Sequence, residues 1–227
     1  MKYSYILLDA DHTLFDFDKA EANALTKVFD YFKIQIDDSV IEVYHHYNHQ
    51  LWKQLELGKI KQGDIKIQRT QYILEYLKVN HVTVEEFSNQ YVEFLAEGHF
   101  LYDGALELCE YLASKYKISI VTNGIEHIQN NRILYSGIHS LLDKIIVSET
   151  VGYSKPDKRV MEYALNEIKC TDKSQVILIG DSLSADIACA NNAGIDSCWY
   201  NPHYNENTSQ YTPRYIVHSY DEIKKLL

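Results

Sequence analysis

A short apolar run that ends in two closely spaced carboxylates is the strongest constraint in this sequence. Residues 5–8 read Tyr-Ile-Leu-Leu, and Asp9, Asp11 and Thr13 follow at alternate positions. An apolar run of this length, bounded by polar residues, is typical of a buried strand in a parallel sheet. Residues i and i+2 of an extended chain share a face, so Asp9 and Asp11 are expected to converge on one small volume. Two carboxylates that close repel one another unless a cation or a shared proton intervenes, and Mg²⁺ prefers such oxygen ligands.

Alone, the acidic pair could merely cap a strand, but three later segments supply further residue types that a phosphate site needs. They offer a hydroxyl at the end of an apolar run, a cation before a helix start and a second acidic pair: Thr122-Asn123-Gly124, Lys155, and Gly180-Asp181 with Asp186. With these segments the sequence resembles the haloacid-dehalogenase-like (HAD) phosphohydrolases. That family carries four motifs in the same order: DxDxT, a strand-end Thr or Ser, a Lys, and GDxxxxD. Each motif alone is a weak signal, whereas the ordered set spans most of the chain.

The segment between Phe17 and Phe100 has helical rather than strand periodicity. Apolar residues recur at spacings of three and four, and the pattern predicts helices over Lys19–Phe32, Asp38–Leu57, Ile65–Leu77 and Val84–Ala96. An all-helical insert after the first strand matches the position of the family's cap domain. The resemblance therefore predicts a helical cap at residues 17–100 and a catalytic core of residues 1–16 and 101–227.

From Leu101 onward, predicted strands and helices alternate, which implies a parallel sheet with right-handed crossovers. Strands are expected at Ile118–Val121, Ile145–Val147, Val176–Ile179 and, as an edge strand, Ser197–Tyr200. Helices are expected near 104–115, 128–135, 156–168 and 184–192. The resemblance adds the strand order 3-2-1-4-5 of a Rossmann-like α/β fold. That order brings Asp9, Thr122 and Asp181 to adjacent strand ends, where open α/β sheets bind ligands.

The resemblance also implies a catalytic role for both carboxylates of the first motif. Asp9 would be the nucleophile that forms an aspartyl-phosphate, which divides a difficult hydrolysis into two easier steps. Asp11 would protonate the leaving oxygen and then activate water. Its presence argues against a haloacid dehalogenase, because halide needs no proton and those relatives lack this acid. The cofactor implied is Mg²⁺, held by Asp9, by the main-chain carbonyl of Asp11 and by Asp181.

The other matched residues are expected to handle the charge of the phosphate. Thr122 can donate its hydroxyl to a phosphate oxygen, and the main chain at Asn123 or Gly124 can add N–H groups. Lys155 supplies a point charge that offsets both the phosphate and the crowded carboxylates. By the same resemblance, Asp186 would hold metal-bound waters or Lys155.

Composition and charge limit the partners. The formal net charge of −10 disfavours a nucleic acid polymer, since affinity for a phosphate backbone comes from clustered Lys and Arg. Four cysteines without CxxC spacing indicate reduced thiols. No signal-peptide core precedes the acidic motif, and no apolar run approaches the roughly 20 residues of a membrane helix. We expect a cytoplasmic protein that acts on a small phosphorylated metabolite, away from membranes.

Weaker features resemble the bacterial pyrimidine 5′-nucleotidases that act on modified nucleotides. One is an N-x-x-LW pattern formed by Asn48, Leu51 and Trp52. Two others are short matches near strand ends: VTNG at 121–124, and Cys198-Trp199 followed by Asn201. This resemblance implies a nucleoside monophosphate substrate, with Asn48 and Trp52 as candidate cap contacts. Three alternatives stay open: a phosphatase of sugar phosphates or phosphoglycolate, a phosphomutase, and an inactive phosphate-binding module. The last would be expected to lack Asp9, Asp11 or Asp181, and all three are present.

Histidines in two places have no assigned role. His45 and His49 stand at i and i+4, a spacing that could hold a transition metal. No carboxylate or third ligand follows at a suitable spacing, so a solvated helix face is the favoured interpretation. His12 occupies a variable position inside the first motif.

Overall fold

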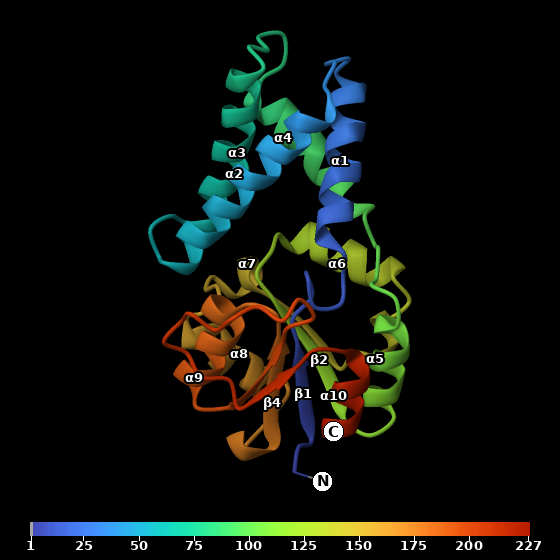
Figure 1. The fold of residues 1–227 in the computed structure, drawn as a ribbon, viewed down its shortest axis with the longest axis vertical. Coiled ribbons are helices and arrows are strands. Elements are labelled where there is room, and N and C mark those ends of the chain that lie inside the picture. The colour runs from blue at the N-terminus through green and yellow to red at the C-terminus, as the bar shows by residue number, and fades with distance from the viewer. Residues whose placement is uncertain (1) are drawn as a thin grey trace. The chain divides into compact units, whose positions relative to one another are not determined.

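The computed structural model describes residues 2–227, which form two compact units (Figure 1). The core unit contains residues 2–16 and Leu101–Leu227, and the helical unit contains Phe17–Phe100. The chain leaves the core unit after its first strand and returns to it at Leu101. Whether these units act as catalytic core and cap stays a prediction.

A parallel sheet forms the centre of the core unit. Across residues 2–227 it has six strands in the order β3-β2-β1-β4-β5-β6. Their bounds are β1 Tyr5–Leu8, β2 Lys117–Thr122, β3 Lys144–Val147, β4 Val176–Gly180, β5 Asp196–Tyr200 and β6 Tyr215–Val217. Leu8 of β1 is in register with Ile120 of β2 and Ile179 of β4, and both pairings are parallel. The segments that follow these three strands therefore begin at the same edge of the sheet.

The predicted α/β class and the order of the first five strands are confirmed. The sheet has one more strand than predicted, however, beyond the expected edge strand. Residues Tyr215–Val217 form β6, which pairs in parallel with β5, so the predicted edge strand at Ser197–Tyr200 lies inside the sheet. Three residues are too few to display the alternation that identifies a strand in a sequence. Helix α10 (Tyr220–Leu226), which follows β6, is likewise absent from the sequence-based expectation.

Helices cover both faces of the sheet (Figure 1). Ile6 and Leu8 of β1 belong to the apolar cluster that includes α5 (Ala105–Ala113) and α10. Leu7, between them, belongs to the opposite cluster, with α8 (Lys158–Glu167) and α9 (Ala188–Ala193). Because both faces are buried, β1 reads as a continuous apolar run instead of an alternating one.

Further helical elements lie in the connections between the strands. They are α6 (Glu126–Tyr135), α7 (Ser148–Val151), the 3₁₀ turns His139–Leu141 and Lys173–Gln175, and a π-helical turn Leu183–Ile187. The predicted helix over 184–192 is thus divided into the π-helical turn and α9. Single π turns of this kind are frequent at functional sites.

The helical unit consists of α1 (Phe17–Tyr31), α2 (Asp38–Glu56), α3 (Gln62–Tyr76) and α4 (Val84–Ala96). Phe29 of α1 packs against Phe87 of α4 with ring centroids 5.1 Å apart. Thr83 and Glu86 form a reciprocal capping box that fixes the start of α4. Along residues 2–227, every helix is too short or too polar to cross a bilayer.

Candidate active site

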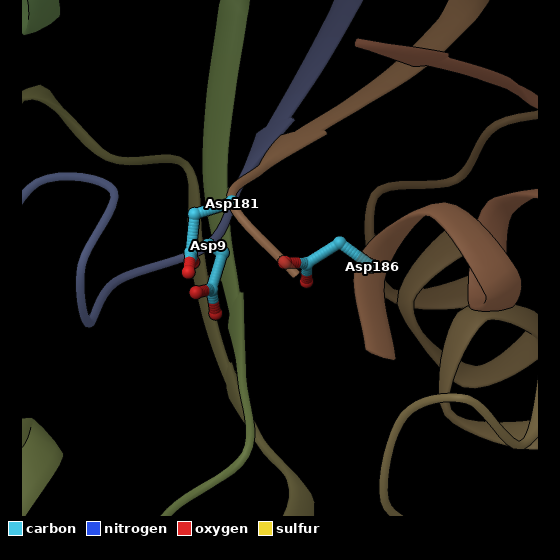
Figure 2. Close-up of side chains that lie close together, drawn as sticks. All are labelled: Asp9, Asp181 and Asp186. Carbon is cyan, nitrogen blue, oxygen red and sulfur yellow. The ribbon is translucent and has the colours of Figure 1, made fainter. Parts of the chain in front are cut away.

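Three carboxylates converge at the edge of the sheet where β1 and β4 end (Figure 2). Asp9 follows β1, Asp181 follows β4, and Asp186 belongs to the π-helical turn. One oxygen from each lies within 4.8 Å of the other two. Figure 2 shows the side chains of Asp9 and Asp181 next to one another, with Asp186 directed toward them.

Lys155 is buried among these carboxylates. Its Nζ donates to Asp9 Oδ1 at 2.5 Å, to Asp186 Oδ1 at 2.7 Å and to the carbonyl of Val121 at 2.8 Å. An ammonium group has three protons, so these contacts use all of them. The side chain of Lys155 is only 2% exposed, which makes the two ion pairs much stronger than surface pairs.

Burial and crowding set the protonation of these groups. Burial raises the pKa of Asp9 well above its usual value, Lys155 opposes that rise, and the Asp186 and Asp181 carboxylates add to it. Burial, together with the charge of Asp186, raises the pKa of Asp181 to about 7. Burial disfavours the charge on Lys155, yet the Asp186 and Asp9 carboxylates outweigh it and raise the pKa of Lys155. The cluster thus places three buried carboxyl groups beside one lysine, and burial makes the loss of their protons costly.

This donor set fits a hard divalent cation. Carboxylate oxygens are the ligands that Mg²⁺ prefers, and a second cation would offset the cost of ionising them. Thr13 Oγ1 donates to Asp181 Oδ1 at 3.2 Å, and Trp199 Nε1 donates to the Asp181 carbonyl at 2.7 Å, so two side chains orient Asp181. Asp9, Asp181 and Asp186 are therefore the acidic residues that could hold a metal ion. The predicted ligands Asp9, Asp181 and the Asp11 carbonyl, and the predicted role of Asp186 in holding metal-bound waters or Lys155, stay predictions.

The Asp11 carboxylate contacts a different set of residues. Arg132 Nη1 donates to Asp11 Oδ1 at 2.5 Å, and Gln129 Nε2 donates to Asp11 Oδ2 at 2.7 Å. β1 ends at Leu8, but the Asp9 amide still donates to the Ile179 carbonyl of β4 at 2.9 Å. That Asp9 and Asp11 share one small volume stays a prediction. The amide of Leu14 donates back to the Ala10 carbonyl at 2.8 Å, and the chain turns over residues 12–14, just after Asp11.

Gln129 and Arg132 did not emerge from the sequence. Both are buried polar residues on α6, three positions apart, and therefore share one helix face. The one available signal was this spacing on a helix that begins directly after the VTNG segment. Such a pair is common on solvated helix faces, so the spacing alone does not identify it.

Of the residues predicted to bind phosphate, Thr122 is buried at the end of β2, and Gln129 Nε2 donates to its Oγ1 at 3.1 Å. The side chain of Asn123 instead fixes the loop that carries Lys155. Asn123 Nδ2 donates to the Lys155 carbonyl at 2.9 Å, and the Lys155 amide donates to Asn123 Oδ1 at 2.8 Å. Phosphate contacts by Thr122, Asn123 and Lys155 stay predictions.

Comparison with known proteins shows the family. A sequence profile described as "Haloacid dehalogenase-like hydrolase" matches residues 6–200. The chain is a member of the HAD-like hydrolase family. It is 34% identical to the HAD-hydrolase YfnB of Bacillus subtilis, over 100% of this chain and 96% of YfnB. A solved structure of YfnB, described as bound to magnesium, superposes with a TM-score of 0.93 at 33% identity, covering 100% of this chain and 99% of that one.

Two further relatives of this HAD hydrolase carry a named activity. The pyrimidine 5′-nucleotidase PynA of Streptococcus pneumoniae is 36% identical, over 98% of this chain and 94% of PynA. The pyrimidine 5′-nucleotidase YjjG of Escherichia coli is 31% identical, over 100% of this chain and 99% of YjjG. The similarity therefore extends through the helical unit as well as the core unit.

The two candidate substrate contacts of this HAD hydrolase lie on α2 of the helical unit. Asn48 is buried, where its Nδ2 donates to Glu21 Oε1 at 2.6 Å and its Oδ1 accepts from Arg69 Nη1 at 3.2 Å. Trp52 is half-buried. His45 Nδ1 lies 2.7 Å from Glu21 Oε2, and this hydrogen bond raises the pKa of His45. Asn48 thus has protein partners already, and both substrate contacts stay predictions.

Gly180→Ala tests the close approach of Asp186 to β4. A Cβ at position 180 would lie 2.2 Å from Asp186 Oδ2, so Asp186 must move and its bond to Lys155 must weaken. Overpacking of this kind costs about 1–3 kcal/mol of unfolding free energy, measurable by urea denaturation. Gly63→Ala is the control, because a Cβ there meets nothing within 4 Å. Equal stability of the two variants would show that Asp186 is not confined by Gly180.

Asp181→Asn tests the cost of ionising a buried carboxyl group. The folded-state pKa of Asp181, about 7, exceeds the ordinary value of 3.8, so the folded metal-free protein binds this proton more tightly than the unfolded chain. The associated stability is present at low pH and is lost as the pH rises through about 7. In metal-free buffer near pH 8, Asp181→Asn should therefore unfold at a higher temperature than the wild type. Identical pH dependence of the two unfolding temperatures would contradict this assignment.

Proposed function

We propose that this HAD hydrolase is a Mg²⁺-dependent phosphatase that hydrolyses small phosphate monoesters through an aspartyl-phosphate at Asp9, with pyrimidine nucleoside monophosphates as substrates. The observation that carries the proposal is that the two carboxylates of the first motif have different partners. Asp9 lies with Lys155 in the buried acidic cluster, whereas Asp11 is held by Gln129 and Arg132. A nucleophile and a proton-transfer group need such different surroundings.

In the first step, an Asp9 carboxylate oxygen attacks phosphorus and the bond from phosphorus to the leaving oxygen breaks. The carboxylic acid of Asp11 gives its proton to that oxygen, so the alcohol departs neutral. In the second step, the Asp11 carboxylate takes a proton from water as the water oxygen attacks the aspartyl-phosphate. Inorganic phosphate leaves, and Asp9 and Asp11 return to their starting states.

Charge neutralisation accounts for much of the remaining catalysis, because phosphoryl transfer depends chiefly on positioning and electrostatic stabilisation. Lys155 holds Asp9 in place and supplies one positive charge beside the reacting group. A Mg²⁺ ion held by Asp9, Asp181 and Asp186 would supply positive charge to the phosphoryl oxygens. Thr122 would donate its hydroxyl to one of these oxygens. Positioned proton transfer by Asp11 is worth about 10²–10⁴-fold.

The substrate class rests on the comparisons and on charge. PynA and YjjG are similar over nearly the whole chain, including the helical unit. The formal net charge of −10 favours a small anion with its own counterion over a polymer. Trp52 is the better candidate for a contact with the nucleoside, because Asn48 would first have to exchange its bonds to Glu21 and Arg69.

Asp9→Asn should abolish turnover and leave the fold intact, because the amide has the shape of the carboxylate but is a poor nucleophile. The expected loss is at least about 10⁴-fold, which is the upper end of what removal of positioned proton transfer alone typically causes. Phosphate release and circular dichroism measure the two outcomes. Turnover near the wild-type rate, in a preparation proven free of wild-type protein, would remove Asp9 from the mechanism.

A substrate panel tests the function itself. We expect uridine, thymidine and cytidine 5′-monophosphates to be hydrolysed with higher kcat/KM than purine nucleotides, phosphoglycolate or hexose phosphates. Activity should disappear after chelation and return with Mg²⁺, but poorly with Ca²⁺, which takes longer bonds and more ligands. A panel led by phosphoglycolate or hexose phosphates would reject the nucleotidase assignment and keep the phosphatase. Full activity after exhaustive chelation would reject the metal requirement.

A further inference from the structure

A closed set of hydrogen bonds surrounds the Asp11 carboxylate. Arg132 Nη1 donates to Asp11 Oδ1 at 2.5 Å and to Gln129 Oε1 at 3.3 Å. Gln129 Nε2 completes the ring by donating to Asp11 Oδ2 at 2.7 Å. Both carboxylate oxygens are thus held from the α6 side, while about a fifth of the Asp11 side chain stays exposed. A carboxylate accepts at about four lone-pair sites, so the remaining sites are free for a reacting partner.

The orientation of the Gln129 amide follows from its partners. An arginine side chain can only donate, so the oxygen of Gln129 must face Arg132. The NH₂ group then faces the Asp11 carboxylate, and it also donates to Thr122 Oγ1 at 3.1 Å. Because Thr122 accepts this bond, its own hydroxyl proton points elsewhere. Gln129 therefore leaves the Thr122 proton available for another acceptor, such as a phosphate oxygen.

The surroundings hold this arrangement rigidly. The side chain of Arg132 is fully buried, and its guanidinium carbon lies 4.9 Å from the centre of the Phe15 ring. Gly124 gives Gln129 its space, because a Cβ there would lie 2.7 Å from Gln129 Nε2 and 2.8 Å from its Cγ. A buried charge is costly unless it is paired, so Arg132 has a strong preference for the Asp11 carboxylate.

We propose that Gln129 and Arg132 are positioning residues for phosphoryl transfer: together they aim the Asp11 carboxyl group at the leaving oxygen. This inference rests on the proposed role of Asp11 as acid and base. A purely structural alternative is that the two residues only anchor α6 to the turn after β1. The two accounts differ in how activity depends on the leaving group.

The test compares a poor leaving group with a good one. An alkyl alkoxide must be protonated as it leaves, whereas p-nitrophenolate departs without a proton. The probes are p-nitrophenyl phosphate and one alkyl phosphate, either uridine 5′-monophosphate or, if the wild type rejects it, the best alkyl phosphate of the panel. The readout is kcat/KM, which covers the steps up to departure of the leaving group and excludes the later hydrolysis of the aspartyl-phosphate.

Arg132→Met and Gln129→Leu should each lower kcat/KM for the alkyl phosphate by at least tenfold more than for p-nitrophenyl phosphate, within the range of about 10²–10⁴ available to proton transfer. Arg132→Lys keeps one charged donor near Asp11 and should lie between the wild type and Arg132→Met. Ile133→Ala is the control for packing, because Ile133 is a buried apolar residue on the same helix. That control should lower both values by the same factor.

Asp11→Asn separates the two levels of the proposal. If Asp11→Asn shows the leaving-group difference but Arg132→Met and Gln129→Leu lose activity equally on both substrates, the positioning role is overturned and the proposed mechanism stands. If Asp11→Asn itself loses activity equally on both, the acid role of Asp11 fails, and the positioning role fails with it. Should Arg132→Met not fold, Gln129→Leu and Arg132→Lys decide by the same criterion.

Discussion

The buried ammonium group of Lys155 is the contact on which the rest of the site depends. It joins Asp9 after β1, Asp186 in the π-helical turn and, through the Val121 carbonyl, the end of β2. Removing one member of a buried ion pair typically costs about 3–5 kcal/mol, because the other charge is left without a partner. Three segments that are distant in sequence are therefore tied to one atom, and the carboxylates can stay close together.

Arg132 is a second buried cation, and it gives Asp11 surroundings different from those of Asp9. Lys155 holds Asp9 and Arg132 holds Asp11, so each carboxylate of the first motif has its own buried cation. Gly180 lies close to Asp186, and Gly124 lies close to Gln129. A Cβ at either position would displace a site residue. Small residues at strand ends thus shape the site as much as the charged ones do.

The fold was largely predictable from the sequence because its strands are buried on both faces and read as apolar runs. The family resemblance gave the strand order and the motif residues, which periodicity cannot provide. β6 is too short to show a pattern. Gln129 and Arg132 look like ordinary polar positions on a helix, and their burial against Asp11 becomes visible only in three dimensions.

The central claim is that Asp9 carries the phosphoryl group during turnover. The most direct measurement is acid quenching of the enzyme during hydrolysis of its best substrate, followed by borohydride reduction and mass spectrometry of the peptide that contains residue 9. An acyl phosphate is reduced to the alcohol, so the account predicts homoserine at position 9, in proportion to the trapped intermediate, and none in Asp9→Asn. Active enzyme with an unmodified Asp9, or with the modification at another carboxylate such as Asp181, would contradict it.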